Sequence, residues 1–347
     1  MNHIAIVGAG LIGRVMAWQL LQAGQRVTLF DRDRIDGDEA AAYTAGGMIS
    51  PLSEIEVLEP ALLQLARQSL QLWPALVDSL GQEVDYHNHG SLIVSHPQDA
   101  AAHQRYLRQL QQHTDPAAAE YSWLNASQLS QQEPELLPGF QQAVFLPGES
   151  WVDPARLMPA LAERILPLCE HWHSGCEVTA IEPHTVICGL DSHRFDLVID
   201  CRGMGAREDL PGLRGVRGEV ARFHAPDVRL THLIRLMHPR YCLYIVPRAN
   251  QRYLIGATQI ESEDRGPVTV RSALELLSAV YSLHKGFAEA RIEAFKTNLR
   301  PAMPDNQPLL SLQSGLMRIN GLFRHGFMLA PAITTQALQQ LQQQGYL

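Results

Sequence analysis

Three glycines near the start of the chain, Gly8, Gly10 and Gly13, constrain its fold more than any other feature. They have the spacing G-x-G-x-x-G, follow a short apolar run rich in β-branched residues, and precede a segment of helical composition that ends at Gly24. The apolar run predicts a buried parallel strand, and a glycine commonly follows the last turn of a helix. In such a unit the first glycine permits a tight turn, the second lets backbone approach a pyrophosphate, and the third lets the helix pack against the strand.

A second predicted strand, residues 26–30, ends at Asp31, which lies 31 − 8 = 23 residues after Gly8. This is close to the spacing of about 20 residues at which an acidic side chain binds the ribose of a dinucleotide. Strand, glycine turn, helix and terminal acid together predict a Rossmann-like dinucleotide site. Arg32 and Arg34 follow, but Asp31 would repel a 2′-phosphate, so NADP is disfavoured.

Length and charge exclude several classes of protein. The 347 residues, 46% of them hydrophobic, suffice for two domains or one large domain. A net charge of −8 argues against nucleic acid as a partner, because phosphate binding requires a basic surface. No stretch reaches the roughly 18 apolar residues of a membrane span, and the first strand begins too early to leave room for a signal peptide. We therefore expect a cytoplasmic protein that does not bind membranes.

The cysteines and histidines predict neither a disulfide framework nor a metal site. There are five cysteines, an odd number without a C-x-x-C pair, which is typical of a reducing compartment with buried free thiols. His87 and His89, like His171 and His173, alternate along predicted strands, but no carboxylate or cysteine completes either set. We interpret them as solvated strand residues.

The rest of the chain alternates between helical and strand-like patterns. The strand predicted at residues 197–199 runs into a second glycine turn at Gly203 and Gly205, far from the first turn. This predicts a dinucleotide domain whose sequence is interrupted by another domain. Periodicity and turn residues predict further helices at 60–80, 99–112, 151–168 and 268–283 and from 334 onward, and further strands at 83–95, 178–194, 219–223, 241–247 and 253–258.

Seven further segments, taken in order, resemble one family. They are TAGGMISPLSE (44–54), WVDPARLMPAL (151–161), VRGEV (216–220), LYIVPR (243–248), LIGAT (254–258), NLRPAMPDNQPLL (298–310) and INGLFRHGFMLAPA (319–332). With the N-terminal glycines they resemble the FAD-dependent D-amino-acid oxidase superfamily, most closely the glycine oxidases of thiamine biosynthesis. The resemblance extends from residue 3 to about residue 335.

This resemblance implies an α/β fold and identifies the dinucleotide as FAD. A Rossmann-like FAD-binding domain (1–82, 150–215 and 297–347) would be interleaved with an α+β substrate domain (83–149 and 216–296) built on a mainly antiparallel sheet. Sarcosine oxidases attach FAD through a cysteine near the C-terminal third, whereas no cysteine follows Cys242 here, so we expect non-covalent FAD.

The resemblance also implies the residues that contact the cofactor. Gly46, Gly47 and Met48 match the turn beneath the flavin, and Val178 matches a backbone contact on the adenine side. The full set that we predict to bind the cofactor is Gly8, Gly10, Leu11, Ile12, Gly13, Asp31, Arg32, Thr44, Ala45, Gly46, Gly47, Met48, Val178, Gly203, Arg300, Arg324, His325, Gly326, Phe327 and Met328.

Three residues are implied in catalysis. Arg300 matches the arginine that pairs with the substrate carboxylate, for which a guanidinium fork is a suitable partner. Tyr244 matches a hydroxyl donor to the same carboxylate, and Arg324 matches the arginine of the F-R-x-G turn near the substrate's amino end. The implied reaction is oxidation of glycine or another small amino acid or amine by hydride transfer to the flavin. The imine then gives a 2-oxo acid and ammonia, and oxygen is reduced to hydrogen peroxide.

Three departures from the family pattern keep other functions open. Ile333 and Thr334 stand where the family continues with Thr-Gly, Asn298 replaces a glycine, and Gln259 replaces an apolar residue near the substrate. One alternative is a D-amino-acid dehydrogenase that passes electrons to a quinone. Another is a flavoprotein that acts on a protein partner, for example in maturing another enzyme's cofactor. A homo-oligomer is compatible with the sequence.

Overall fold

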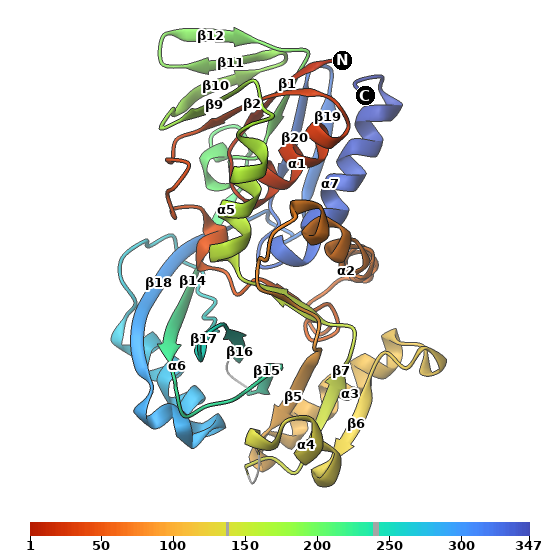
Figure 1. Cartoon of the computed structure of the whole chain (residues 1–347), viewed down its shortest axis with the longest axis vertical. Coiled ribbons are helices and arrows are strands. Elements are labelled where there is room, and N and C mark those ends of the chain that lie inside the picture. The colour runs from red at the N-terminus through yellow and green to blue at the C-terminus, as the bar shows by residue number, and fades with distance from the viewer. Residues whose placement is uncertain (137–138, 239–242) are drawn as a thin grey trace.

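The computed structural model describes residues 1–136, 139–238 and 243–347, and its first layer is a mainly parallel sheet. The strand order is β19–β20–β13–β1–β2–β9, in which β19 pairs antiparallel with β20 and the other neighbours are parallel (Figure 1). The strands are β1 (His3–Val7), β2 (Arg26–Asp31), β9 (His171–Ser174), β13 (Leu197–Asp200), β19 (Leu309–Gln313) and β20 (Leu316–Asn320). The central strands are nearly continuous apolar runs because both faces of the sheet are covered.

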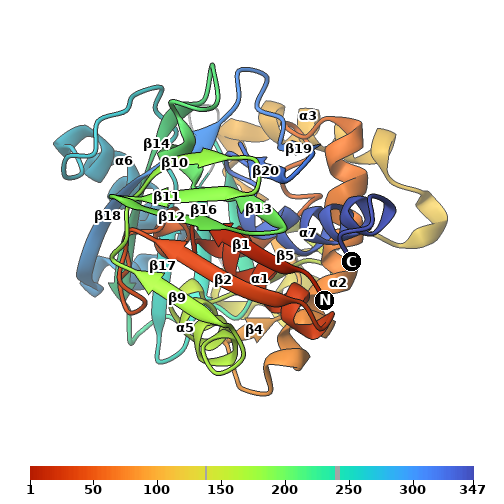
Figure 2. The ribbon, with the colours of Figure 1, turned by 90° about the horizontal axis from the view of Figure 1, so that it is seen from above.

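Helices cover one face of this sheet and a small antiparallel sheet covers the other. Ile4 and Ile6 of β1 pack with residues of the helices α1 (Leu11–Gln22), α2 (Pro60–Leu80), α5 (Pro154–Ile165) and α7 (Gly326–Gln343). The alternate residues Ala5 and Val7 pack against β10 (Val178–Glu182) and β11 (Thr185–Cys188), which β12 (Asp191–Arg194) extends. The sheet of β10, β11 and β12 lies beside β1 and β2 in both views, and the two chain ends lie close together (Figure 2).

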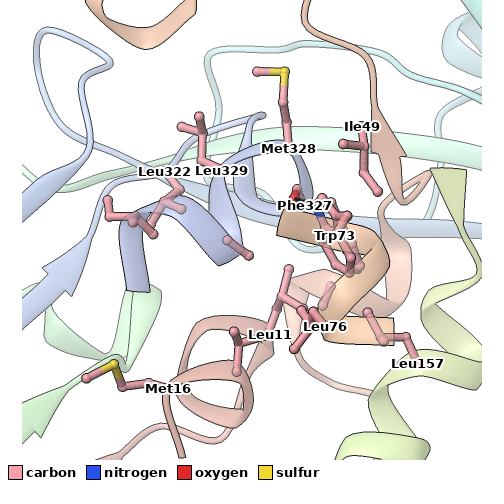
Figure 3. Close-up of a cluster of buried hydrophobic side chains, with 14 of the residues drawn as sticks. Leu11, Met16, Ile49, Trp73, Leu76, Leu157, Leu322, Phe327, Met328 and Leu329 are labelled. Carbon is pink, nitrogen blue, oxygen red and sulfur yellow. Dashed lines mark hydrogen bonds between the residues drawn. The ribbon is translucent and has the colours of Figure 1, made fainter. Parts of the chain in front are cut away.

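Trp73 links three of these helices in the core. Its ring stacks on Phe327 with centroids 6.4 Å apart, and its Nε1 donates to the Phe327 carbonyl at 3.0 Å. Figure 3 shows this pair among Leu11, Leu76 and neighbouring apolar side chains of α1, α2 and α7. The packing holds the first turn of α7 in place at the edge of the first sheet.

The second layer is a mainly antiparallel sheet in the order β18–β14–β17–β16–β15–β5–β7–β6. Within the described residues, β15 and β5 form its only parallel pair. Its strands are β5 (Ser91–Ser95), β6 (Ser122–Asn125), β7 (Gln142–Leu146), β14 (Arg214–His224), β15 (Leu233–Met237), β16 (Leu243–Arg248), β17 (Arg252–Gly256) and β18 (Arg291–Ala302). The helix α6 (Val270–Leu283) packs on one face, and α3 (Ala100–His113) and α4 (Ala126–Gln132) lie at the other end of the layer.

Short elements connect the two layers. The strands β3 (Met48–Ile49), β4 (Tyr86–His87) and β8 (Ser150–Val152) form a small sheet between them. The 3-10 helices are η1 (Ala41–Thr44), η2 (Pro97–Asp99), η3 (Pro116–Ala118), η4 (Pro134–Leu136), η5 (Gly203–Ala206) and η6 (Lys285–Glu289).

The predicted α/β fold with an interleaved, mainly antiparallel second layer is confirmed, with two local corrections. The helix expected from residue 151 begins at Pro154 behind the N-cap Asp153, because the preceding residues form β8. The last helix begins at Gly326 rather than at Thr334. Residues 241–242, predicted to begin a strand, lie outside the described residues, and the predicted domain boundaries stay a prediction.

The expectation of free thiols is wrong for two cysteines. Cys176 and Cys188 are joined in a disulfide at the start of β10 and the end of β11, with Cα atoms 6.5 Å apart. Cys169 and Cys201 are the free cysteines among the described residues. The hairpin between the paired cysteines brings them together, which a count of cysteines does not predict.

Candidate active site

A cavity of about 870 Å³ is lined by residues of both layers. On the first sheet, its walls follow the carboxyl ends of the parallel strands β1, β2 and β13. On the second sheet, they include residues of β14, β16, β17 and β18. The carboxyl ends of parallel strands are the usual ligand site of open α/β sheets, where the strand order reverses.

The three glycines of the N-terminal motif have different environments. Gly8 has a φ of +94°, and a Cβ there would lie 2.7 Å from the Cys201 carbonyl group. A Cβ on Gly13 would lie 1.9 Å from the Gly8 oxygen, so this position sets the close packing of α1 on β1 and stays outside the cavity. Gly10 has open space and is the N-cap of α1 without a side-chain cap. The N-terminus of α1 therefore presents free N–H groups, as a pyrophosphate site requires.

Asp31 occupies the expected place at the end of β2. Its carboxylate accepts hydrogen bonds from the backbone N–H groups of Ala9 and, at 2.8 Å, Asp33. Burial raises the pKa of Asp31, and these two donors act in the opposite direction. Arg32 and Val178 line the same end of the cavity.

A turn after η1 and the start of α7 form the middle of the cavity. Gly47 has a φ of +66°, and a Cβ there would lie 2.0 Å from the Val152 oxygen. Gly326 has open space around its Cα, and the His325 side chain does not cap the helix that starts there. Backbone N–H groups of α7 therefore face a region in which another molecule can approach closely.

Arg300 on β18 is a half-buried cation at the second-sheet end of the cavity. Its Nη1 donates to the carbonyls of Thr258 at 3.1 Å and Arg217 at 3.3 Å. No carboxylate within the described part of the chain forms an ion pair with it. Burial, and then the nearby charge of Arg324, lower the pKa of Arg300 to about 10, so it remains cationic at neutral pH.

A second group of side chains surrounds a buried carboxylate, Glu54. The Tyr244 hydroxyl donates to Glu54, and an Arg324 Nη2 lies 2.8 Å from one carboxylate oxygen and 2.9 Å from the other. Arg324 also donates to the Gln259 amide oxygen at 3.2 Å. Burial lowers the pKa of His325 to about 4, which leaves this imidazole neutral at pH 7.

The alternation of strand residues explains why Tyr244 faces the cavity. Tyr244 of β16 and Leu254 of β17 belong to a cluster with Trp151, whereas Ile245 and Ile255 point to the opposite face and pack with α6. Successive residues of a strand point to opposite faces of the sheet. The apolar pattern of these strands therefore determines which residues line the cavity.

All the residues predicted for the site line this cavity except Gly13, but their roles stay predictions. Ile333 lies in the buried core around α7 and does not line the cavity, so this departure from the family pattern does not change the lining. Asn298 lines the cavity and donates to the Glu39 carbonyl at 3.1 Å.

Among the lining residues that were not predicted, two that directly contact the predicted catalytic side chains are of particular interest. Glu54 is one, and Gly218 of β14, which lies under the Arg300 guanidinium, is the other. Both fall inside segments that resemble the family, TAGGMISPLSE and VRGEV. A charged residue directly after a cofactor-facing turn was the available signal for Glu54.

The lining fits FAD. Uncapped N-termini of α1 and α7 face the cavity at two points, and open space adjoins Gly10 and Gly326. Such helix ends stabilise the negative charge of a pyrophosphate or of a flavin ring.

No group of three or more His, Cys, Asp or Glu residues suited to a metal ion occurs in residues 1–136, 139–238 and 243–347. Within these same ranges, none of the helices has the length and apolar character needed to cross a membrane.

Comparisons with known proteins place the chain in a family. The chain is 36% identical to a putative thiamine biosynthesis oxidoreductase ThiO of Rhizobium etli, over 98% of this chain and 96% of the relative. It is 27% identical to a bifunctional protein ThiO/ThiG of Trichormus variabilis, over 95% of this chain and 51% of the relative. The crystal structure of glycine oxidase from Geobacillus kaustophilus superposes with a TM-score of 0.85 at 25% identity, over 99% of this chain and 95% of that one. A family model described as FAD dependent oxidoreductase (DAO) matches residues 3–336, so the chain belongs to the DAO family of FAD-dependent oxidoreductases.

Proposed function

We propose that this enzyme oxidises glycine or another small α-amino acid, and that Arg300 binds the substrate carboxylate. The observation that carries the proposal is the half-buried Arg300 guanidinium, which lines the cavity and lacks an ion pair with any described carboxylate. A buried charge is stable only when it is paired and hydrogen-bonded. A planar guanidinium is also the donor best suited to bidentate binding of a carboxylate.

The remaining parts of the cavity support an oxidation at the α-carbon. Bound FAD supplies the two-electron acceptor for hydride transfer. Arg300 would hold the amino acid by its carboxylate, and the turn of Gly46, Gly47 and Met48 would hold the flavin in the same cavity. Apolar residues of β16 and β17 would exclude water. The products that we propose are an imine, which water converts to a 2-oxo acid and ammonia, and hydrogen peroxide from oxygen. We also propose a role in thiamine biosynthesis, which the name of the Rhizobium etli relative supports, and a cytoplasmic location.

The test is anaerobic reduction of the flavin by glycine, by other small amino acids, and by amines without a carboxylate. We expect Arg300→Ala to lose about 2–4 kcal/mol in kcat/KM for the amino acid, because it removes a charge-assisted pair from a buried site. Reduction by the amine should change far less. Arg300→Lys should recover only part of the loss, because an ammonium group does not reproduce the fork.

Arg252→Ala is the matched control, since Arg252 pairs with Glu293 on the exposed side of β17 and does not line the cavity. This variant should leave the rates of flavin reduction by the amino acid and by the amine unchanged. Equal losses for amino acid and amine in Arg300→Ala would show that Arg300 only supports the structure.

A protein partner is the second candidate, and one comparison favours it. In the ThiO/ThiG relative, the part that matches this chain is about half of a longer bifunctional protein. Under this second candidate, we propose that a separate protein partner receives the product of this chain. Absence of flavin reduction by every free amino acid and amine would favour this candidate over the first.

A further inference from the structure

Glu54 is a buried carboxylate in the substrate end of the cavity, and the reaction proposed above assigns it no role. It lies in the turn between β3 and α2, is 5% exposed, and lines the cavity together with Arg300 and Arg324. Tyr244 and Arg324, which hold it, are 190 and 270 residues away in sequence. The fold therefore brings an anion to the place where a small substrate would bind.

One oxygen of this carboxylate is not fully satisfied. Oε1 accepts from Tyr244 and Arg324, whereas Oε2 is buried and accepts no hydrogen bond from the described residues, although Arg324 lies 2.8 Å away. Buried polar atoms of native proteins almost always have hydrogen-bond partners, so such an oxygen requires an explanation. Burial alone would raise the pKa of Glu54, but nearby positive groups, Arg324 first, outweigh it and lower the pKa. Oε2 therefore belongs to an anion whose nearest described cation is Arg324, and this oxygen is hidden from solvent.

The charges at this end of the cavity match the two ends of an α-amino acid. Arg300 is a cation without a described ion-pair partner, and Glu54 is an anion that lines the same cavity and pairs with Arg324. The negative charge of Glu54 raises the pKa of Arg300, so Arg300 lies within electrostatic reach of this carboxylate. A carboxylate bound to Arg300 with an amino group bound to Glu54 would satisfy both.

We propose that Glu54 accepts a hydrogen bond from the substrate's amino group and so selects amino acids over other small carboxylates. The inference rests on the proposed function, since it takes Arg300 as the carboxylate site. Selection follows from charge. The Glu54 anion attracts the amino group of an amino acid bound to Arg300, and it repels a bound carboxylate that has no amino group. The competing explanation is that Glu54 only neutralises Arg324.

Glu54→Gln separates the two explanations, because the amide keeps an acceptor for Tyr244 and Arg324 while the charge is lost. For glycine, the dissociation constant comes from the concentration dependence of anaerobic flavin reduction. For acetate, it comes from the change in flavin absorbance of the holoenzyme. We expect glycine to bind about ten- to a hundredfold more weakly. Acetate should bind as tightly as to the wild type, or more tightly, because repulsion is removed.

Glu56→Gln is the matched control. Glu56 lies two residues further along the same turn, pairs with Arg235 at 2.6 Å and does not line the cavity. This variant should leave the ratio of the two dissociation constants unchanged. Equal weakening of glycine and acetate in Glu54→Gln would overturn the proposal and leave Glu54 as a neutralising residue.

Two further outcomes are informative. If Glu54→Gln does not retain FAD, Glu54→Asp takes its place; it keeps the charge but withdraws it by one methylene, so glycine should weaken while acetate does not change. Wild-type affinity of this variant for glycine would contradict the proposal. Wild-type reduction by glycine or another small amino acid is a separate readout, and its failure would reject the proposed function itself.

Discussion

At the scale of single residues, Gly218 determines where the Arg300 guanidinium lies. Gly218 of β14 is opposite Asn298, two residues from Arg300 on β18. A Cβ at this position would lie 2.4 Å from the central guanidinium carbon of Arg300 and 2.5 Å from both terminal nitrogens. These atoms are the far end of a flexible side chain, so Gly218→Ala should displace the guanidinium while the strand pairing persists.

We therefore expect Gly218→Ala to weaken acetate binding about tenfold or more while FAD affinity and the melting temperature change little. Titration of the holoenzyme with acetate, together with thermal unfolding, checks both parts. The contrary result is a variant that loses stability but binds acetate like the wild type, and it would mean that Gly218 serves strand packing alone.

Single residues also show where sequence reasoning about the site succeeds and where it stops. Arg300, Tyr244 and Arg324 stand in segments that resemble a known family, and the structure places all three on one cavity. Glu54 also stands in such a segment, but the segment does not predict its contacts, because its partners come from β16 and from the turn before α7. The contact depends on how the turn after β3 folds back, which no local pattern of residues specifies.

At the scale of elements, the turn that carries Glu54 is anchored to the start of β8 by a buried acid. Glu149 accepts from the Ser53 backbone N–H at 2.7 Å and from the Ser53 hydroxyl, and it is 1% exposed. Burial raises the pKa of Glu149 to about 7, although hydrogen bonds from Ser53 and Ser91 oppose this. The ordinary value of the unfolded chain is 4.5.

This difference makes stability fall as pH rises. Between about pH 4.5 and about pH 7 the folded protein holds a proton on Glu149 that the unfolded chain has lost. The free energy of unfolding therefore decreases across this window, by up to roughly 3 kcal/mol in total. Glu149→Gln stays neutral at every pH, so it should be more stable than the wild type at pH 8 and nearly equal to it at pH 4.5.

Urea unfolding of the holoenzyme at both pH values measures the effect. The exposed Glu182 of β10 supplies a control, because Glu182→Gln should unfold like the wild type at both. A Glu149→Gln variant that is less stable than the wild type at pH 8 would show that the hydrogen bonds to the charged form outweigh burial.

Periodicity predicts most elements because one face of each is buried. The helix α2 follows the predicted range, and the start of α5 behind Asp153 obeys ordinary capping chemistry. The start of α7 was predicted eight residues late because His325 and Gly326 are typical of a turn. Here packing of the first helical turn against Trp73 decides the conformation, and that contact joins residues 254 positions apart.

At the scale of the whole molecule, the interruption of one layer by the other is predictable, whereas the cavity between them is not. A second glycine turn after β13 indicated that the dinucleotide layer resumes late in the chain, and β13 indeed pairs with β1. The shape of the cavity depends on the relative placement of two sheets built from separate segments. Long-range packing sets that placement, and it leaves no periodic trace in the sequence.

This architecture predicts how FAD is held. Two of the described cysteines line the cavity: Cys176 is in a disulfide, and burial raises the pKa of the Cys201 thiol well above its usual value. A thiol held in its neutral form is a poor nucleophile, and no cysteine follows Cys242 in the chain. We therefore expect non-covalent FAD, so that acid precipitation leaves the flavin in the supernatant.

Since the cofactor would contact both layers, its release should destabilise the whole chain rather than one part of it. Free FAD at a hundredfold excess over its Kd should stabilise the folded protein by about 2.7 kcal/mol relative to the apoprotein. Thermal unfolding of the apoprotein at increasing FAD concentrations, followed both by far-ultraviolet circular dichroism and by tryptophan fluorescence, measures this. Both signals should shift together. Flavin retained in the acid pellet would contradict the non-covalent attachment, and a shift in one signal alone would show that FAD contacts a single layer.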